Sequence, residues 1–158
     1  MTDTMTSTAS LVRLSKEDDL MVANSDEDIR GRKVLDKSGE EIAEVEDLLL
    51  DVSQKEVRFL MVGSGGHGPA KKIGKKKSLI PVEAIIAIDE DSVTVDQSGD
   101  DIIGAPEYDP AIVEVPKEKN YWDKWYGWYG YYPYGGPYYR YGGPYYRYPG
   151  YFRVYRRF

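Results

Sequence analysis

The stretch that decides the fold is EIAEVEDLLLDVSQKEVRFLMV, residues 41–62. Two apolar runs flank the polar break SQKE, and this pattern predicts two strands joined by a turn. In the second run Val57, Phe59 and Met61 share one face of a strand, and Arg58 begins the set on the other face. Leu60 and Val62 follow Arg58 on that other face.

The first run breaks its own alternation. Its apolar parity breaks around Glu46 and Asp47, and three leucines, Leu48 to Leu50, follow in succession. Either a β-bulge at this point or burial of both strand faces from Leu48 to Leu50 explains the break.

Short β-like runs and turns continue on both sides of this stretch. Residues 33–36 (KVLD) lead into the turn KSGE, where Gly39 can adopt a positive φ. Residues 78–88 (SLIPVEAIIAI) and 92–95 (SVTV) supply further strands after a loop rich in glycine and lysine. The pattern predicts an all-β domain, a small and strongly bent antiparallel sheet or barrel of about five or six strands.

Residues 26–110 resemble the PRC-barrel family, which includes the cytoplasmic domain of the photosynthetic reaction centre H subunit and the C-terminal domain of the ribosome maturation factor RimM. The markers, in chain order, are Asp28, Arg30, Gly31, Gly39, Asp47, Asp51, Arg58, Phe59, Ile80, Pro81, Ala105 and Pro106. The resemblance implies a PRC-type antiparallel β-barrel over residues 26–116 that serves as a docking or scaffold module without chemistry of its own.

The rest of the chain differs from both relatives. Residues 1–25, a partly disordered segment, are too few for the second barrel of RimM, and their polar composition does not supply the membrane helix of the H subunit. Three functions stay open: a docking or scaffold protein, an RNA- or ribosome-associated module similar to RimM, and support of membrane electron transfer similar to the H subunit.

A tail of different composition occupies residues 117–158. Residues 1–120 hold 15 of the 21 Lys and Arg and 26 of the 27 Asp and Glu, whereas residues 121–158 hold six basic residues and one acidic residue. The unit GGPYYRY occurs twice, at 135–141 and 142–148. The density of glycine and proline, together with the scarcity of aliphatic residues, predicts a disordered, low-complexity tail.

The repeats combine tyrosine rings with guanidinium groups. Each exposed Arg–Tyr cation–π contact contributes only about 0.5–1 kcal/mol, so many of them must act together. We expect the tail to bind a protein partner or a second copy of the chain. Binding of single-stranded RNA and a passive low-complexity tail are the alternatives. The candidate residues are Tyr138, Tyr139, Arg140, Tyr145, Tyr146, Arg147, Arg156 and Arg157.

An aromatic segment precedes the repeats. Trp122, Trp125 and Tyr129 would line one face of a helix, although Gly127 weakens helix formation. These rings either form an interface with a protein or membrane or fold back onto the barrel and complete its core. The sequence alone leaves both interpretations open.

A basic cluster lies in the loop at 63–77. Its members are Lys71, Lys72, Lys75, Lys76 and Lys77. They form either a solvated loop that protects a strand edge or a patch that faces RNA, acidic protein or lipid headgroups, and the first interpretation is favoured. GSGGHG, at 63–68, matches a dinucleotide motif by letter, but no helix pattern follows it, so we expect a hairpin loop.

No constellation in the sequence indicates catalysis, a cofactor or a metal. The chain has no cysteine, and its one histidine, His67, stands between glycine-rich neighbours. No carboxylate pair is recognisable as an acid and a base, so we expect a protein without enzymatic activity. Without a secretory signal or a membrane-length apolar run, the expected location is the cytoplasm, with peripheral contact at the inner membrane face as the alternative.

Overall fold

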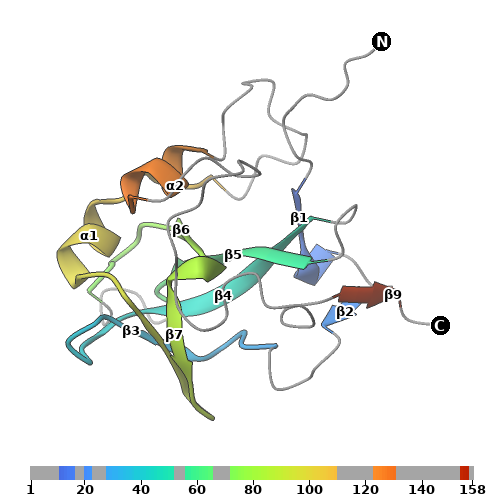
Figure 1. The fold of residues 1–158 in the computed structure, drawn as a ribbon, viewed down its shortest axis with the longest axis horizontal. Coiled ribbons are helices and arrows are strands. Elements are labelled where there is room, and N and C mark those ends of the chain that lie inside the picture. Colours follow the sequence, from blue (N-terminus) through green and yellow to red (C-terminus); the bar gives the residue numbers. More distant parts are fainter. Residues whose placement is uncertain are drawn as a thin grey trace.

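The computed structural model describes residues 11–16, 20–22, 28–51, 56–65, 72–109, 123–130 and 154–156. The strands are β1 (Leu11–Arg13), β2 (Leu20–Val22), β3 (Lys33–Leu35), β4 (Glu41–Asp51), β5 (Glu56–Gly63), β6 (Ser78–Pro81), β7 (Ile85–Ile88), β8 (Ser92–Val95) and β9 (Val154–Arg156). The helices are α1 (Gly99–Gly104) and α2 (Asp123–Trp128), with 3-10 turns η1 (Leu14–Lys16) and η4 (Val82–Ala84). The described part of the chain is thus mostly β-strand with few helices, as predicted (Figure 1).

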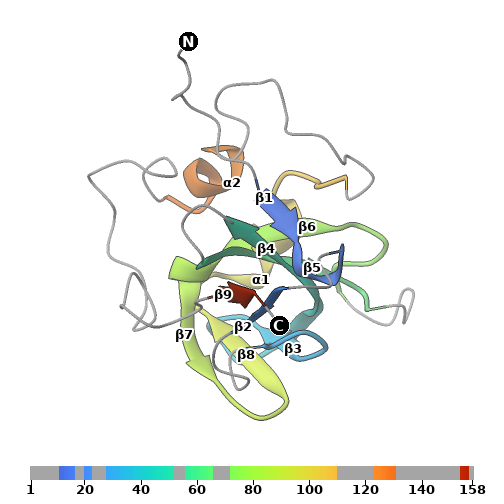
Figure 2. The same cartoon turned by 90° about the vertical axis from the view of Figure 1, so that its right-hand side faces the viewer.

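One seven-stranded sheet forms the body of the protein. Its strands follow the order β6-β5-β4-β3-β8-β7, and β1 pairs with the end of β4. In Figure 2 these strands curve around a common interior. Among the described strands, β6 and β7 stand at the two ends of the path and are not paired with each other, but η4 joins them directly in the chain. The sheet is therefore strongly bent and open along this path.

One strand pair corrects the expected purely antiparallel sheet. β3 and β8 run parallel, with Lys33 opposite Ser92 and Leu35 opposite Thr94. A parallel pair requires a long crossover, and the chain between them supplies one in the form of β4 to β7. Bending the sheet brings β8 back beside β3, which local patterns in the sequence do not reveal.

Two β-bulges interrupt the long ladder between β4 and β5. Val45 pairs with Val62 and Asp47 with Met61, so Glu46 is an extra residue on β4. This register shift confirms the bulge predicted from the broken alternation.

The second bulge lies on β5 at Arg58. Leu49 pairs with Phe59 and the next residue, Leu50, pairs with Val57, so Arg58 is the extra residue. A bulge turns its side chain away from the direction that simple alternation gives.

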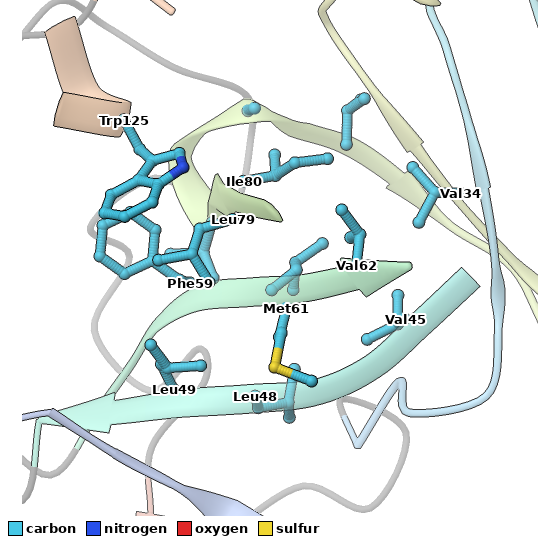
Figure 3. Packing of buried hydrophobic residues seen from close by; sticks show 14 of the residues in the cluster. Val34, Val45, Leu48, Leu49, Phe59, Met61, Val62, Leu79, Ile80 and Trp125 are labelled. Atoms are coloured by element: carbon cyan, nitrogen blue, oxygen red, sulfur yellow. The ribbon is translucent and has the colours of Figure 1, made fainter. Parts of the chain in front are cut away.

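The core lies inside the curve of the sheet. Leu48, Leu49 and Leu50 are all fully buried, so the second explanation of the broken alternation also holds. Figure 3 shows β4 and β5 side by side, with Met61 and Val62 among the buried side chains. Burial of both faces explains the almost continuous apolar runs of these strands.

Both ends of the chain contribute strands. β1 pairs with β4 through Leu11 opposite Asp51, so the sheet includes residues before the predicted domain start at 26. β2 and β9 form a separate two-stranded sheet in which Leu20 lies opposite Arg156. The last strand of the predicted tail therefore returns to a strand near the N-terminus (Figure 1).

A buried carboxylate fixes the turn between β3 and β4. Asp36 Oδ1 accepts hydrogen bonds from the backbone N–H groups of Ser38 and Glu40, both at 2.9 Å. Its Oδ2 accepts from the N–H of Gly99 at 3.2 Å, at the start of α1. Gly39 takes φ +87° within this turn, as its place in KSGE predicts. Asp36 therefore ties the turn to α1.

Replacing this carboxylate should destabilise the fold. Asp36→Ala leaves three backbone donors without their acceptor, and the free energy of unfolding should fall by about 1–3 kcal/mol. Urea denaturation followed by circular dichroism measures the change. Glu90→Ala, at an exposed position in the β7–β8 turn, is the control and should stay within about 0.5 kcal/mol of wild type. Equal stability of the two variants would contradict the role of Asp36.

Candidate functional site

The most elaborate arrangement of side chains surrounds α2, a six-residue helix from the predicted tail. The N–H of Tyr129 donates to Trp125 O at 3.1 Å and continues the last turn. Gly130 follows at φ +85°, a conformation that ends helices and suits glycine. The density of glycine thus limits α2 to a short helix, as the sequence predicts for this segment.

The inner face of α2 lies in the core. Trp125 and Tyr126 are both 0% exposed, and Tyr129 is also buried. The Phe59 ring meets Trp125 at a centroid distance of 6.3 Å and Tyr126 at 5.2 Å, both edge to face. Tyr108 packs edge to face on Trp125 at 6.0 Å. Figure 3 shows Trp125 reaching from α2 to Phe59 and Leu79. Of the two interpretations of the aromatic face, the packing agrees with completion of the core.

Two indole groups attach α2 to the segment that begins in α1. Trp125 Nε1 donates to Pro106 O at 2.9 Å, and Trp128 Nε1 donates to Asp101 O at 2.7 Å. Gly104 lies against the Trp128 ring, because a Cβ at this glycine would stand 3.2 Å from Trp128 Cζ2. The two acceptors, the carbonyls of Asp101 and Pro106, therefore receive indole N–H groups that are three residues apart in the chain and lie on one side of the helix.

A buried polar group completes the contact. Arg58 Nη2 donates to the Tyr126 hydroxyl at 2.9 Å and lies 3.2 Å from Glu83 Oε2. The Tyr126 hydroxyl donates towards the Glu83 carboxylate, at 3.2 Å from Oε1 and 3.3 Å from Oε2. All three side chains are almost completely buried. Opposite charges that lie this deep are stable only when they are paired and hydrogen bonded, and Tyr126 supplies part of that requirement.

The residues that contact α2 form one surface, which we call the helix-receiving surface. It comprises Arg58 and Phe59 from β5, Glu83 from η4, and residues 101–108 from α1 and the segment after it. Rings, carbonyl oxygens and an ion pair are groups that bind a peptide. Within the described ranges, no group of three or more His, Cys, Asp or Glu is arranged to hold a metal ion.

Three of the four described lysines of the predicted basic cluster contact other parts of the protein. Lys72 pairs with Glu40, and Lys77 Nζ lies 2.5 Å from Glu46 Oε1. Lys76 Nζ donates to Ile103 O, and burial lowers the pKa of this lysine. These contacts attach the loop after residue 71 to β4 and α1, and they agree with a structural role for the cluster.

Many predicted binding residues lie outside the described residues. They are Lys71, Trp122, Tyr138, Tyr139, Arg140, Tyr145, Tyr146, Arg147 and Arg157, and His67 also lies there. Arg156 belongs to β9, and Lys75 is exposed in its loop. Their binding roles stay predictions.

Sequence reasoning missed Tyr126 and Glu83. Glu83 is a lone acid in the apolar run 78–88, as Arg58 is a lone base in its own strand. Each unusual charge could have indicated that a buried partner exists. Neither could have indicated which residue it is.

A bent sheet built on strands β3 to β8, with the aromatic helix α2 packed against it, defines a small β-domain. The family model described as PRC-barrel domain matches residues 21–102, slightly more than half of the chain. The chain therefore belongs to the PRC-barrel family, as the sequence markers indicated. Domains of this family are in general non-enzymatic and mediate protein interactions. No curated protein matches the chain.

Several family markers have structural roles here. Arg30 and Asp28 form a bidentate ion pair before β3, in which Arg30 Nη2 lies 2.6 Å from Oδ2 and Nε lies 2.7 Å from Oδ1. The N–H of Gly31 donates to Val45 O at 2.7 Å. Asp47 accepts from the N–H groups of Ser15 and Leu48, while the Ser15 hydroxyl donates to its other oxygen.

No helix among the described residues has the length and apolar character needed to cross a membrane.

Truncation of the buried and of the exposed tryptophan of α2 should lower the free energy of unfolding by different amounts. Trp125→Ala removes a fully buried ring and its hydrogen bond, and should lower the free energy of unfolding by about 3–5 kcal/mol. Trp128 is 48% exposed, so Trp128→Ala should cost clearly less. Chemical denaturation monitored by far-UV circular dichroism gives both values. If Trp128→Ala proved the more damaging variant, the placement of α2 would be incorrect.

The Asp28–Arg30 pair predicts a pH effect. Burial alone raises the pKa of Asp28, but the hydrogen bonds and charge of Arg30 outweigh it and hold the pKa below its ordinary value. The pair therefore stabilises the fold above the unfolded-state pKa, about 3.9, and this contribution disappears as the pH falls through the lower folded-state pKa.

Arg30→Met should raise the pKa of Asp28 in a carboxyl NMR titration. The stability difference from wild type should shrink below about pH 4. Arg32→Met is the control, because the charge of Arg32 is the smallest of the influences on Asp28 and its guanidinium donates to Asp89 O. An unchanged Asp28 titration in Arg30→Met would refute this assignment.

Proposed function

We propose that this protein is a non-catalytic docking or scaffold module that binds a protein partner or a second copy of itself. The bent sheet and α2 form its body, and the Tyr/Arg repeats between α2 and β9 make the contacts. The observation that carries the proposal is the docking of α2, because it attaches the start of the tail to the body. The helical segment ends at Gly130, and the first repeat begins at Gly135.

The chemistry of the repeats supports binding to proteins. Tyrosine supplies large rings with a polar end, which suit interfaces, and arginine stacks on such rings while it pairs with carboxylates. The segment 121–158 carries six basic residues and one acidic residue, whereas residues 1–120 carry an excess of acidic ones. An acidic protein surface, including that of a second copy, is therefore an electrostatically suitable partner.

The location of α2 determines how the proposal must be tested. Deletion of residues 121–158 would remove Trp125 and Tyr126 from the core, so lost assembly could reflect unfolding. Substitutions confined to the repeats avoid this problem. The test variant changes Tyr138, Tyr139, Tyr145 and Tyr146 to Ser and Arg140 and Arg147 to Gln.

We expect the wild-type sedimentation coefficient to rise with protein concentration and that of the repeat variant to stay constant. The melting temperature should be the same for both, because α2 and β9 are unchanged. Lys37→Gln, which removes one exposed positive charge from the turn between β3 and β4, should sediment like wild type. Crosslinking and capture with wild type and repeat variant then tests for a different protein partner. Identical sedimentation and identical captured proteins for both chains would refute the proposal.

The alternative is an RNA-binding function. It would replace the proposal if the wild-type chain bound single-stranded RNA in a salt-sensitive manner, the repeat variant lost this binding, and neither chain captured a protein.

A further inference from the structure

α2 owes its conformation to the surface beneath it. A helix of six residues is too short to persist alone in water, and Gly127 within it costs roughly a further 1 kcal/mol relative to alanine. Its order therefore comes from the burial of Trp125 and Tyr126 and from the hydrogen bonds to the body. Structurally, α2 behaves as a peptide bound to a receptor.

The helix-receiving surface recognises particular side chains. It offers Pro106 O and Asp101 O to two indole N–H groups, and the Arg58–Glu83 pair to one phenol hydroxyl. Each of these contacts depends on the sequence of the helix. None depends on the helix belonging to the same chain.

The connection to α2 is long enough for it to reach another molecule. Residues 110–122, thirteen in number, join Asp109 to α2, and such a segment spans up to roughly 43–47 Å when extended. The basic segment that carries α2 would also approach the acidic body of a second copy favourably.

We propose that the helix-receiving surface also binds the α2 segment of a second copy of this chain, in a reciprocal exchange that gives a symmetric dimer. The exchanged helix makes the same contacts as the original one, so only its attachment differs. The connection gives each chain's own α2 a high effective concentration at its own surface, which favours the monomer. Exchange therefore becomes more favourable as the concentration of the protein rises. This inference rests on the proposed docking function and names a second copy as the partner, but it places the contact at α2 and not at the repeats.

Cysteine crosslinking between full-length chains tests the exchange, since the wild-type chain has no cysteine. One chain carries Gly127→Cys on α2, where a Cβ meets nothing within 4 Å, and the other carries Asp101→Cys at an exposed position of α1. The control partner carries Glu90→Cys in the exposed β7–β8 turn. The chains are refolded together, treated with a short bis-maleimide, and the linked peptides are identified by mass spectrometry.

We expect the 127–101 link between chains to exceed the 127–90 link and to increase with concentration. Association through the repeats alone would raise both links equally, which would overturn the exchange while leaving the docking function intact. The same measurement in the repeat variant should still give the 127–101 link. Absence of any excess of the 127–101 link also overturns the exchange.

A complementary pair of variants sharpens the test. Tyr126→Phe weakens the helix of one chain, and Glu83→Gln weakens the receiving surface of the other. After exchange, the unchanged α2 of the Glu83→Gln chain lies on the unchanged surface of the Tyr126→Phe chain. The altered helix then lies on the altered surface, where the two substitutions affect the same hydrogen bond, so their free-energy costs do not add. The Glu83→Gln chain carries Gly127→Cys, and the Tyr126→Phe chain carries Asp101→Cys. The yield of the 127–101 link should be at least two-fold higher than with the same cysteines in otherwise wild-type chains. This factor corresponds to a coupling free energy of about 0.5 kcal/mol. Circular dichroism confirms that each variant is folded, and an unchanged yield in folded variants contradicts the exchange.

Discussion

Burial of the opposite charges of Arg58 and Glu83 is the constraint on which the rest of this structure depends. Two charges removed from water are tolerated only when they are paired and their remaining hydrogen-bonding capacity is met. Tyr126 meets part of it, and the rings around it exclude solvent. Because Tyr126 lies beyond residues 21–102, where the family model matches, a segment outside the family unit completes the interior of this PRC-barrel protein.

The bulges of the β4–β5 ladder explain how an apolar sheet accommodates such charges. Each bulge takes one charged residue out of the alternation, Glu46 on β4 and Arg58 on β5. Each of these residues then meets an opposite charge from a later part of the chain, Lys77 in the first case and Glu83 in the second. The irregularities of the ladder are therefore the points at which the sheet is joined electrostatically to the segments that cover it.

The sequence predicts the parts of this fold that depend on local pattern. Apolar runs and turn residues locate β3 to β8, and the broken alternation locates the bulge at Glu46. The bulge at Arg58 leaves no such signal, because the residues that follow it in β5, Phe59 to Val62, are apolar on both faces. The parallel pairing of β3 with β8 and the burial of Trp125 depend on contacts between distant segments, and periodicity carries no information about these. The aromatic spacing could therefore indicate a helix face but not what that face would cover.

The pairing of β9 with β2 affects how the repeats can vary. Residues 131–153 connect two held segments, α2, which packs on the body, and β9, which pairs with β2. For a chain segment closed in this way, the entropic cost of closure grows only with the logarithm of its length, and a doubling costs about 0.6 kcal/mol. One added GGPYYRY unit would cost a fraction of that. Gain or loss of repeat units is therefore almost neutral for the stability of the body, so the number of GGPYYRY units is free to change in evolution while the fold stays constant.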